Sequence, residues 1–393
     1  MSLKEEEPAT PSGAHTVRPG PIPDRVCLMI GQLGLGGAEK QIALLARELN
    51  ERGIRTDLLV MFERGPREAE LLGSGVRIVD LGFRVRRPLL AGLMANARAF
   101  GRLVHHLRRT RPQILQAFLF HSYLIAAPAA RLAGVPVLVA GRRSLGDYKQ
   151  GRRLALAAER LATRWTDSVV ANAQAVADDV RRNEGVPASK ITVIPNGMPL
   201  RDFEPAPAAT VETSLPLLVC VANLAAHKGH RYLLDACDLL RSRARGCTLV
   251  LIGEGPERTA LVSQAERLGI DARFLGARTD VARFLARADV VVLPSLHEGC
   301  SNAVMEALAA GRPVVATSVG GTSELLRGRG VLVPPEDAAA LADGLQHLLD
   351  NRELADEFGR QGRAWARANL SVEAMADRYV SLYRELLERR CAA

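Results

Sequence analysis

Short apolar runs alternate with amphipathic stretches along almost the whole chain. An apolar run of roughly four to eight residues, bounded by turn residues, is typical of a buried strand. A longer stretch with apolar residues at helical spacing is typical of a helix that covers a sheet. The alternation of the two therefore predicts an α/β protein in which helices cover parallel sheets.

The first set of these elements occupies residues 24–197. It opens with a strand at 25–30, a glycine-rich turn and a helix at about 38–52. A second helix is expected near 89–109, with Arg98, Arg102 and Arg109 facing outward, off an apolar stripe of Leu90, Leu93, Met94, Ala97, Val104 and Leu107. Further strands are expected at 56–62, 76–82, 113–120, 136–142, 168–172 and 191–197.

A proline-rich segment without periodicity, residues 198–215, interrupts the pattern and is expected to be a linker. The pattern restarts over 216–370, with strands expected at 217–223, 247–255, 272–276, 289–295, 313–318 and 330–335. An amphipathic helix at 371–393 is expected to pack back on the N-terminal domain. The sequence thus predicts two doubly wound, Rossmann-like domains that face a cleft, with ligands at the carboxyl ends of the strands.

Composition narrows the class of protein. The 393 residues include 48% hydrophobic and 24% charged residues, which is an ordinary globular balance. No apolar run reaches the roughly 20 residues of a membrane span. Residues 1–23 lack the apolar core of a secretory signal, so a disordered tail and a cytoplasmic location are expected. The six cysteines show no paired spacing and are expected to be reduced.

The net charge of +9 is unevenly distributed. Between Leu81 and Gly146 there is no Asp, Glu or Lys, while arginine occurs at positions 84, 86, 87, 98, 102, 108, 109, 111, 131, 142 and 143. Such a field attracts anionic lipid or a phosphorylated substrate, and peripheral docking on a membrane is one interpretation. Solvated helix faces are the other. Nucleic acid is not expected, because aromatic residues make up 4% and accompany no recognition motif.

Two strand-to-helix turns are candidates for binding phosphate. Gly36 and Gly37 follow the first strand and open a helix, where backbone N–H groups can approach an anion. Their order is not G-x-G-x-x-G, which disfavours a dinucleotide. In the second half, Lys228 follows a strand and could neutralise a diphosphate as a mobile point charge.

The stretch from Leu296 to Gly321 carries the most specific chemistry. Gly299 and Cys300 form the turn after a strand, and Ser301 or Asn302 can cap the helix that follows. Glu298 precedes this cap, and Glu306 lies about one turn inside the helix. Each carboxylate can accept hydrogen bonds from a sugar diol, while the helix N-terminus can hold a phosphate between them. This arrangement predicts a receptor for a ligand that joins sugar, diphosphate and ribose.

With these motifs the chain resembles the retaining glycosyltransferases of family 4, which have the GT-B fold. The resemblance rests on E-x-x-x-x-x-x-x-E from Glu298 to Glu306, together with "GLGGAEKQ", "IPNGMPLRDF", "HKG" and "LIGEGPE", in the order of the family over about 25–390. It implies a nucleotide-diphosphate sugar donor on the C-terminal domain and a hydroxyl acceptor on the N-terminal domain. A lipid-linked or cell-envelope acceptor would suit the Arg-rich segment.

The resemblance also implies roles for individual residues. Glu306 would bind the ribose hydroxyls and Glu298 the donor sugar. The diphosphate would be held by Lys228 and by N–H groups from Gly299, Cys300, Ser301 and Asn302, with Gly36 and Gly37 approaching from the other domain. His121 would touch the donor sugar or the acceptor.

Two positions depart from the family pattern. Asn223 stands where relatives often have an arginine ahead of the lysine, and the resemblance implies that it would lie near the donor diphosphate, so another group would have to complete the cationic clamp. Many relatives also have a histidine where this chain reads "QAF" at 116–118, which makes the role of His121 less secure.

The expected reaction moves a sugar to a hydroxyl group with retention at the anomeric carbon. In the mechanism proposed for the family, the leaving phosphate helps to deprotonate the acceptor, so the sequence need not supply a dedicated base. No metal and no other cofactor are expected, because the sequence has no D-x-D set at a strand end. A nucleotide-sugar epimerase and a catalytically silent binding subunit on the same fold are the alternatives.

Overall fold

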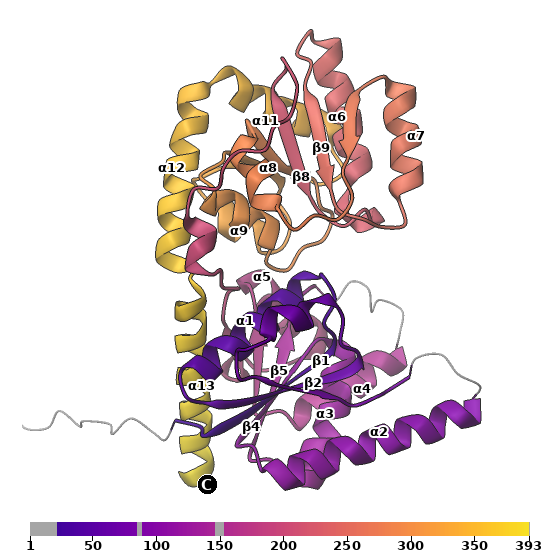
Figure 1. Ribbon diagram of the computed structural model, residues 1–393, viewed down its shortest axis with the longest axis vertical. Coiled ribbons are helices and arrows are strands. Elements are labelled where there is room, and N and C mark those ends of the chain that lie inside the picture. Colours follow the sequence, from indigo (N-terminus) through magenta and orange to yellow (C-terminus); the bar gives the residue numbers. More distant parts are fainter. Residues whose placement is uncertain (1–21, 85–88, 146–152, 393) are drawn as a thin grey trace, which may run out of the picture.

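Two parallel sheets, each covered by helices, form the two halves of the molecule (Figure 1). The computed structural model describes residues 22–84, 89–145 and 153–392. The tail expected over residues 1–23 therefore lies almost entirely outside the described residues, as do Arg86 and Arg87 of the Arg-rich segment. Within the described ranges, no helix has both the length and the apolar character that crossing a bilayer requires.

The first sheet has seven strands in the order β3-β2-β1-β4-β5-β6-β7. All neighbouring strands are parallel, and the order reverses between β1 and β4. The strands are β1 (Arg25–Gln32), β2 (Arg55–Glu63), β3 (Arg77–Asp80), β4 (Ile114–Phe118), β5 (Val137–Arg142), β6 (Ser168–Ala171) and β7 (Ile191–Val193). The helices are α1 (Gly37–Glu51), η1 (Pro66–Leu71), α2 (Leu89–Thr110), α3 (Phe120–Ala133), α4 (Arg153–Arg164), α5 (Gln174–Glu184) and η3 (Ala188–Lys190).

The second sheet has six parallel strands in the order β10-β9-β8-β11-β12-β13. They are β8 (Leu217–Val221), β9 (Thr248–Ile252), β10 (Asp271–Phe274), β11 (Val290–Leu293), β12 (Val314–Thr317) and β13 (Val331–Val333). The helices are η5 (Ala226–Lys228), α6 (His230–Ser242), α7 (Arg258–Leu268), α8 (Val281–Arg287), α9 (Asn302–Ala309), α10 (Thr322–Leu326), α11 (Ala338–Asp350), α12 (Arg352–Asn369) and α13 (Val372–Ala392). The predicted fold class, two Rossmann-like domains, is confirmed.

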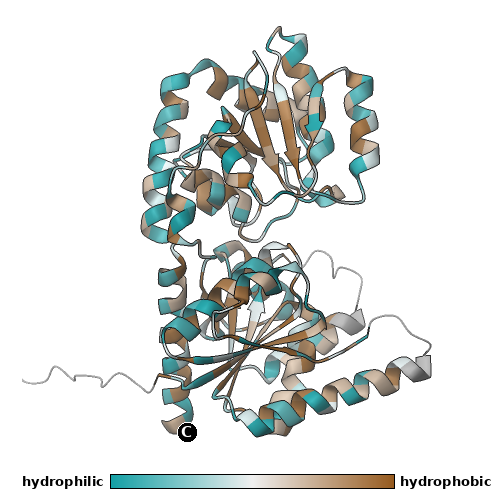
Figure 2. Ribbon diagram, in the orientation of Figure 1, coloured by the Kyte–Doolittle hydropathy of each residue, from teal (hydrophilic) through white to brown (hydrophobic). Residues whose placement is uncertain are grey.

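The central strands are mostly apolar because helices cover both faces of each sheet (Figure 2). Successive side chains of a strand point to opposite faces. In β1, Val26, Leu28 and Ile30 accordingly belong to one buried cluster, while Cys27 and Met29 belong to another. The same division in β8 sends Leu217 and Val219 to one face of the second sheet and Leu218 and Cys220 to the other.

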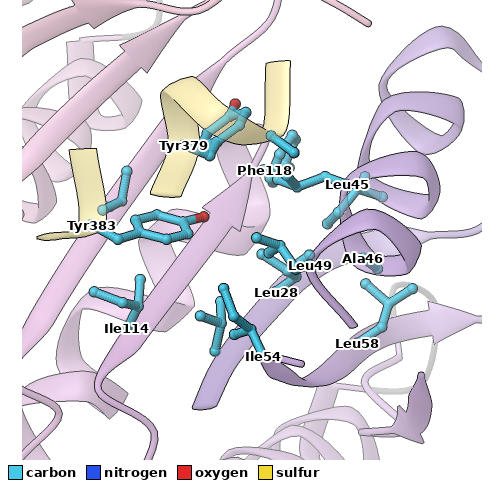
Figure 3. Close-up of a cluster of buried hydrophobic side chains, with 14 of the residues drawn as sticks. Leu28, Leu45, Ala46, Leu49, Ile54, Leu58, Ile114, Phe118, Tyr379 and Tyr383 are labelled. Carbon is cyan, nitrogen blue, oxygen red and sulfur yellow. The ribbon is translucent and has the colours of Figure 1, made fainter. Parts of the chain in front are cut away.

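The C-terminal helices join the two halves along one side. Helix α12 lies beside the second sheet, and α13 continues past the first (Figure 1). In the core of the first half, Tyr379 and Tyr383 of α13 lie among residues of β1, β4 and α1 such as Leu28, Phe118 and Leu45 (Figure 3). The Tyr383 hydroxyl donates to Gln116 Oε1 at 2.6 Å, and both side chains are fully buried.

The segment 198–215 begins where the chain passes between the two halves. Met198 forms a β-bridge with Ser371, so the two crossings of the chain lie side by side. The Met198 N–H donates to Leu370 O at 2.8 Å, and the Val372 N–H donates to Met198 O at 2.9 Å. The segment then forms η4 (Leu200–Phe203), and Phe203 packs in the core of the second half.

The stripe expected on α2 is wrong in its first half. Ala99, Leu103 and Leu107 are the positions buried against the sheet and α3, whereas Leu93 and Met94 are 67% and 58% exposed. The helix starts beyond the edge of the sheet (Figure 1), and Leu93 and Met94 lie in this outer part, while the side chain of Leu90 lies outside the described residues. Helical spacing alone does not reveal where a covering helix stops touching its sheet.

Two arginines of the Arg-rich segment do not contribute to a surface field. Arg142 is 4% exposed, and its guanidinium pairs with Glu184 at 2.8 Å while lying over the ring of Tyr123. Arg143 is 8% exposed and faces the gap between the two halves. Both follow from the position of strand β5 in the middle of the first sheet.

We expect Tyr383→Phe to lower the free energy of unfolding by about 1–3 kcal/mol, because the buried Gln116 carbonyl would lose its donor. Urea unfolding followed by circular dichroism measures the change. Tyr232→Phe is the matched control, since that hydroxyl contacts the exposed Arg231 guanidinium and lies outside the core. Equal losses for the two variants would contradict this view of the Tyr383 hydroxyl.

Candidate functional site

A cleft of about 1090 Å³ lies between the two halves, where the carboxyl ends of both sheets face each other. Its walls include residues that directly follow strands, among them Arg143, Asn172, Ala222 and Gly253. Because the carboxyl ends of parallel strands lie at the same edge of a sheet, the loops that follow them lie close together. The cleft is the region where the sequence predicts chemistry.

The loop before α9 fits the predicted strand, turn and helix cap. Strand β11 ends at Leu293, α9 begins at Asn302, and Ser301 is the cap because its hydroxyl accepts from the Val304 N–H at 3.3 Å. Gly299 faces the other half so closely that an added Cβ would lie 2.2 Å from Arg143 O. Only glycine fits there. The loop is thereby positioned against β5 of the opposite domain.

Glu298 is held by groups of its own domain. Its Oε1 accepts from Lys228 Nζ at 2.5 Å and from Ser295 Oγ at 2.9 Å. The Glu298 side chain is 10% exposed, so the partial loss of its hydration is offset by an ammonium group and a hydroxyl. The lysine predicted to bind diphosphate therefore lies directly beside the carboxylate predicted to bind the donor sugar.

Glu306 is held from the opposite domain. Its Oε1 accepts from Lys40 Nζ at 2.6 Å, and Lys40 Nζ also lies 3.6 Å from Asp202 Oδ2. Burial lowers the pKa of Lys40, but the charge and the hydrogen bond of Glu306 outweigh this effect, and the pKa is raised above its ordinary value. Lys40 is thus a cation at neutral pH that bridges the two domains.

Asn302 joins three segments at the mouth of α9. Its Oδ1 accepts from Asn196 Nδ2 at 2.8 Å and from Gln41 Nε2 at 3.3 Å. Its Nδ2 donates to Gly37 O at 3.3 Å, and a Cβ on Gly37 would lie only 2.9 Å from that amide nitrogen. The glycine turn after β1 therefore meets the start of α9 directly.

The predicted phosphate-facing groups converge on the cleft. Gly36 is the N-cap residue of α1, and Gly37 is the first residue of that helix. Of the predicted site residues, the following line the cleft: Gly36, Gly37, Asn223, Lys228, Glu298, Gly299, Cys300, Ser301, Asn302 and Glu306. They come from both domains and more than 260 residues of sequence separate Gly37 from Asn302, so only the fold brings them together.

His121 has a different place. It lies in the first turn of α3, exposed, with its ring edge-on to Phe62 and Phe120 at centroid distances of 6.5 and 5.4 Å. Among the described residues that line the cleft, its chain neighbour Leu119 is present and His121 is not. The strand ends at Phe118, three residues before this histidine. Its proposed contact with donor or acceptor stays a prediction.

Several residues of the cleft escaped the sequence analysis. Lys40 lies three residues after Gly37, and Asn196 lies within the "IPNG" motif, so the motifs contained them without assigning a role. Basic residues outnumber acidic ones on the walls of the cleft. The basic residues are Lys40, Arg67, Arg143, Arg201, Lys228, Arg278, Arg312 and Arg363, and the acidic residues are Glu70, Asp202, Glu204, Glu298 and Glu306. The excess suits an anionic ligand.

Arg143 connects the cleft to the C-terminal helix. Its guanidinium donates to Asn196 Oδ1 at 2.9 Å and to the Tyr379 hydroxyl at 2.6 Å, and it lies 4.5 Å from the centroid of the Phe118 ring. Burial raises the pKa of Tyr379, although Arg143 opposes this effect, so the tyrosine is a neutral acceptor. The position of Arg143 therefore depends on the packing of α13.

Among the described residues, Cys27, Asp57 and His106 form a group that could ligate a metal, with ligand atoms within 4.8 Å of one another. They come from β1, β2 and α2, and none of them lines the cleft. His106 Nε2 lies 2.9 Å from Asp57 Oδ2, so a hydrogen bond already accounts for two of the three groups.

Two known protein families match separate parts of this chain. The family described as "Glycosyltransferase Family 4" matches residues 35–202, and that described as "Glycosyl transferases group 1" matches residues 215–351. A glycogen synthase of Mycobacterium tuberculosis is 31% identical over 291 residues, which are 70% of this chain and 69% of the relative. The chain belongs to glycosyltransferase family 4. It is a glycosyltransferase with the GT-B fold.

Two further proteins show the range of likeness. The lipopolysaccharide core biosynthesis glycosyltransferase LpsE of Rhizobium meliloti is 27% identical over 364 residues, which cover 88% of this chain and 95% of the relative. The crystal structure of HepE of Anabaena in complex with UDP superposes with a TM-score of 0.78 at 20% identity, over 92% of this chain and 100% of HepE. At that identity the structural likeness supports the fold.

We expect the stability of this glycosyltransferase to fall as the pH drops from about 6.5 to about 4, because of His230. Burial and the nearby charge of Lys228 lower the pKa of His230 to about 4, and neither ring nitrogen has a hydrogen-bond partner among the described residues. The unfolded chain therefore binds this proton first, at a cost to the folded state of up to about 3 kcal/mol.

Urea unfolding at pH 7.5 and pH 5 measures this effect. His230→Leu should lose less stability between the two pH values than the wild type, while His347→Gln, at an exposed position, should behave as the wild type does. A pH dependence that is unaltered in His230→Leu would assign the acid sensitivity to other groups.

Proposed function

We propose that this glycosyltransferase moves a sugar from a nucleotide-diphosphate sugar to a hydroxyl acceptor, with retention at the anomeric carbon. The observation that carries the proposal is the pair of carboxylates beside the N-terminus of α9, each held by a lysine in a cleft between two domains. Carboxylates can accept hydrogen bonds from sugar hydroxyls and a helix N-terminus can hold a phosphate, so this arrangement supports a ligand that joins sugar, diphosphate and ribose.

In the proposed complex the donor extends along the mouth of α9. Glu306 binds the ribose hydroxyls, and Glu298 binds the transferred sugar. Lys228 and the N–H groups of residues 299–302 hold the diphosphate, which the turn at 36–37 approaches from the other domain. HepE, which has the same fold, binds UDP in its crystal structure, and this likeness supports a nucleotide ligand for the present chain.

The chemistry proposed for the cleft is stabilisation of a diphosphate leaving group. Lys228 and the helix N-terminus act on the charge that develops as the glycosidic bond breaks. The leaving phosphate takes the proton of the acceptor on the same face of the sugar, which gives retention. Glu298 bonds Lys228 and Ser295, so we assign it to orienting the sugar. Closure of the two domains excludes water and limits hydrolysis.

We further propose a lipid-linked or cell-envelope acceptor and docking on an anionic membrane surface at the cytoplasmic side. The relative LpsE acts in lipopolysaccharide core biosynthesis by its name. In this chain, the N-terminal half of α2 exposes Leu93 and Met94, and Arg98 and Arg109 are exposed further along the same helix. Exposed apolar side chains beside arginines are the combination that binds anionic interfaces.

The alternatives are distinguished by simple assays. A nucleotide-sugar epimerase would convert the donor without any acceptor. A silent binding subunit would bind the nucleotide sugar, or a partner, without turnover. The intact carboxylate–lysine pairs favour a catalytic protein.

The donor proposal predicts that one of UDP, GDP, ADP and TDP raises the melting temperature of the purified protein, and that EDTA leaves the shift unchanged. Glu306→Ala should weaken binding of that nucleotide by about 1–3 kcal/mol, the order for unpairing a buried hydrogen-bonded group. Calorimetric titration measures the affinity. No shift with any of the four nucleotides would argue against the donor class, and loss of the shift in EDTA would indicate a metal requirement.

The docking proposal predicts that replacing Leu93 and Met94 by serine and Arg98 and Arg109 by glutamate abolishes binding to liposomes that contain anionic lipid. Flotation of the protein with such vesicles measures binding. The matched control reverses the charge of two exposed arginines of the C-terminal domain, Arg267 and Arg352, and should bind as the wild type does. Equal loss in both variants would mean that net charge, and not this surface, governs binding.

A further inference from the structure

The dipeptide Lys40-Gln41 in the first turns of α1 contacts the opposite side of the cleft and the start of the crossing between the domains. Lys40 Nζ donates to Glu306 Oε1 at 2.6 Å, in the second domain. Gln41 is 1% exposed; its Oε1 accepts from the Gly197 N–H at 2.8 Å, and its Nε2 donates to Gly197 O at 2.9 Å. Gly197 precedes the crossing of the chain between the domains.

The ion pairs of Lys40 are partly buried, which strengthens their attraction. The side chains of Lys40 and Glu306 are each 21% exposed, so water screens their attraction less than it screens a surface pair. Lys40 also lies 3.6 Å from Asp202, which is beside the crossing segment. One ammonium group therefore faces two carboxylates, and both carboxylates line the cleft.

The contacts of Gln41 hold the start of α1 where the Lys40 side chain can reach Glu306. The bidentate contact of Gln41 fixes the start of α1 against the backbone at Gly197, and its amide also meets Asn302 at 3.3 Å. The helix is thereby anchored one residue away from Lys40. When the domains separate, the anchor at Gly197 can persist within the first half, but the contact between Lys40 and Glu306 must break.

We propose that Lys40 is a positioning residue for donor binding, which holds Glu306 in place across the cleft when the two domains are closed. The proposal rests on the proposed function of Glu306 as the ribose-binding carboxylate. A carboxylate can accept several hydrogen bonds, so Glu306 can bind Lys40 and a ribose hydroxyl together. Lys40 would then orient the carboxylate for the hydroxyls and favour the closed arrangement that binds the donor.

This arrangement links affinity for the donor to closure of the domains. A ligand that binds the closed state gains whatever Lys40 contributes to that state, because ligand binding and closure share one equilibrium. Since the ribose is remote from the bond that breaks, the contribution should affect binding of the substrate and of the transition state alike. Loss of Lys40 should therefore raise KM for the donor and change kcat less.

The test compares Lys40→Met, Lys40→Arg, Glu306→Gln and the double variant Lys40→Met/Glu306→Gln. Arg47→Met is the matched control, because Arg47 lies on the same helix and pairs with Glu51 of that helix at 3.6 Å. UDP, GDP, ADP and TDP are titrated separately into each variant, and steady-state kinetics follow with the sugar of whichever nucleotide binds.

We expect Lys40→Met to raise Kd and the donor KM roughly tenfold, the scale of about 1.4 kcal/mol, with a smaller change in kcat. Lys40→Arg should restore most of the affinity, and Arg47→Met should change nothing. In the Glu306→Gln background, Lys40→Met should have little further effect. A full additional loss there would overturn the proposal, because Lys40 would then act on the ligand directly.

The proposal and the function on which it rests fail differently. Wild-type affinity in Lys40→Met, together with weakened binding in Glu306→Gln, would remove the role of Lys40 and leave that of Glu306. Wild-type affinity in Glu306→Gln would remove the ribose-binding role itself. Should Lys40→Met fail to fold by circular dichroism, Lys40→Arg and the double variant decide, since they keep the charge or remove both charges.

Discussion

Charge compensation in a partly buried gap is the constraint on which this structure depends. Two carboxylates at the end of one sheet, Glu298 and Glu306, lie at low exposure, and each requires a cation. One cation comes from the turn after β8 and the other from α1 of the opposite domain. The pair of Lys40 and Glu306 joins the two domains, whereas that of Lys228 and Glu298 lies within one domain. The charge balance around Glu306 therefore depends on the distance between the domains.

The geometry of parallel sheets makes this dependence possible. Both sheets direct their carboxyl ends into the same gap, so the loops of one domain meet those of the other. At Gly299 this approach leaves no room for a side chain against Arg143 O. Arg143 in turn bonds Tyr379 of α13, a helix that follows the second domain in sequence and packs in the core of the first. The position of Arg143 in the wall of the cleft therefore depends on the apolar packing of α13. Asn302 adds a second link between the domains through its hydrogen bonds to Asn196 and Gly37.

The sequence was sufficient for the fold class and for the convergence of most site residues, because both follow from local patterns. Strand, turn and helix cap around Ser301 are encoded within a few residues, and parallel topology then brings the loops together. What local pattern could not provide is contact between distant segments. Lys40 stands in a motif whose recognisable feature is its glycines, and nothing in the local sequence indicates that Glu306 is its partner. The sequence also did not reveal that Leu93 is exposed and Arg142 buried, because burial depends on where an element meets the rest of the fold.

The lysine–glutamate pairs also bear on how a donor enters. A diphosphate arriving beside Lys228 would compete with Glu298 for the ammonium group, which now lies 2.5 Å from that carboxylate. As the lysine shares its charge, the carboxylate becomes free to accept hydrogen bonds from a sugar hydroxyl, while Ser295 keeps it in place. Binding of the diphosphate and binding of the sugar would thus be coupled, because the diphosphate changes the hydrogen bonding of Glu298, the group proposed to bind the sugar. Preorganised charges that exchange partners in this way need little rearrangement of side chains, which leaves domain closure as the principal motion that binding must drive.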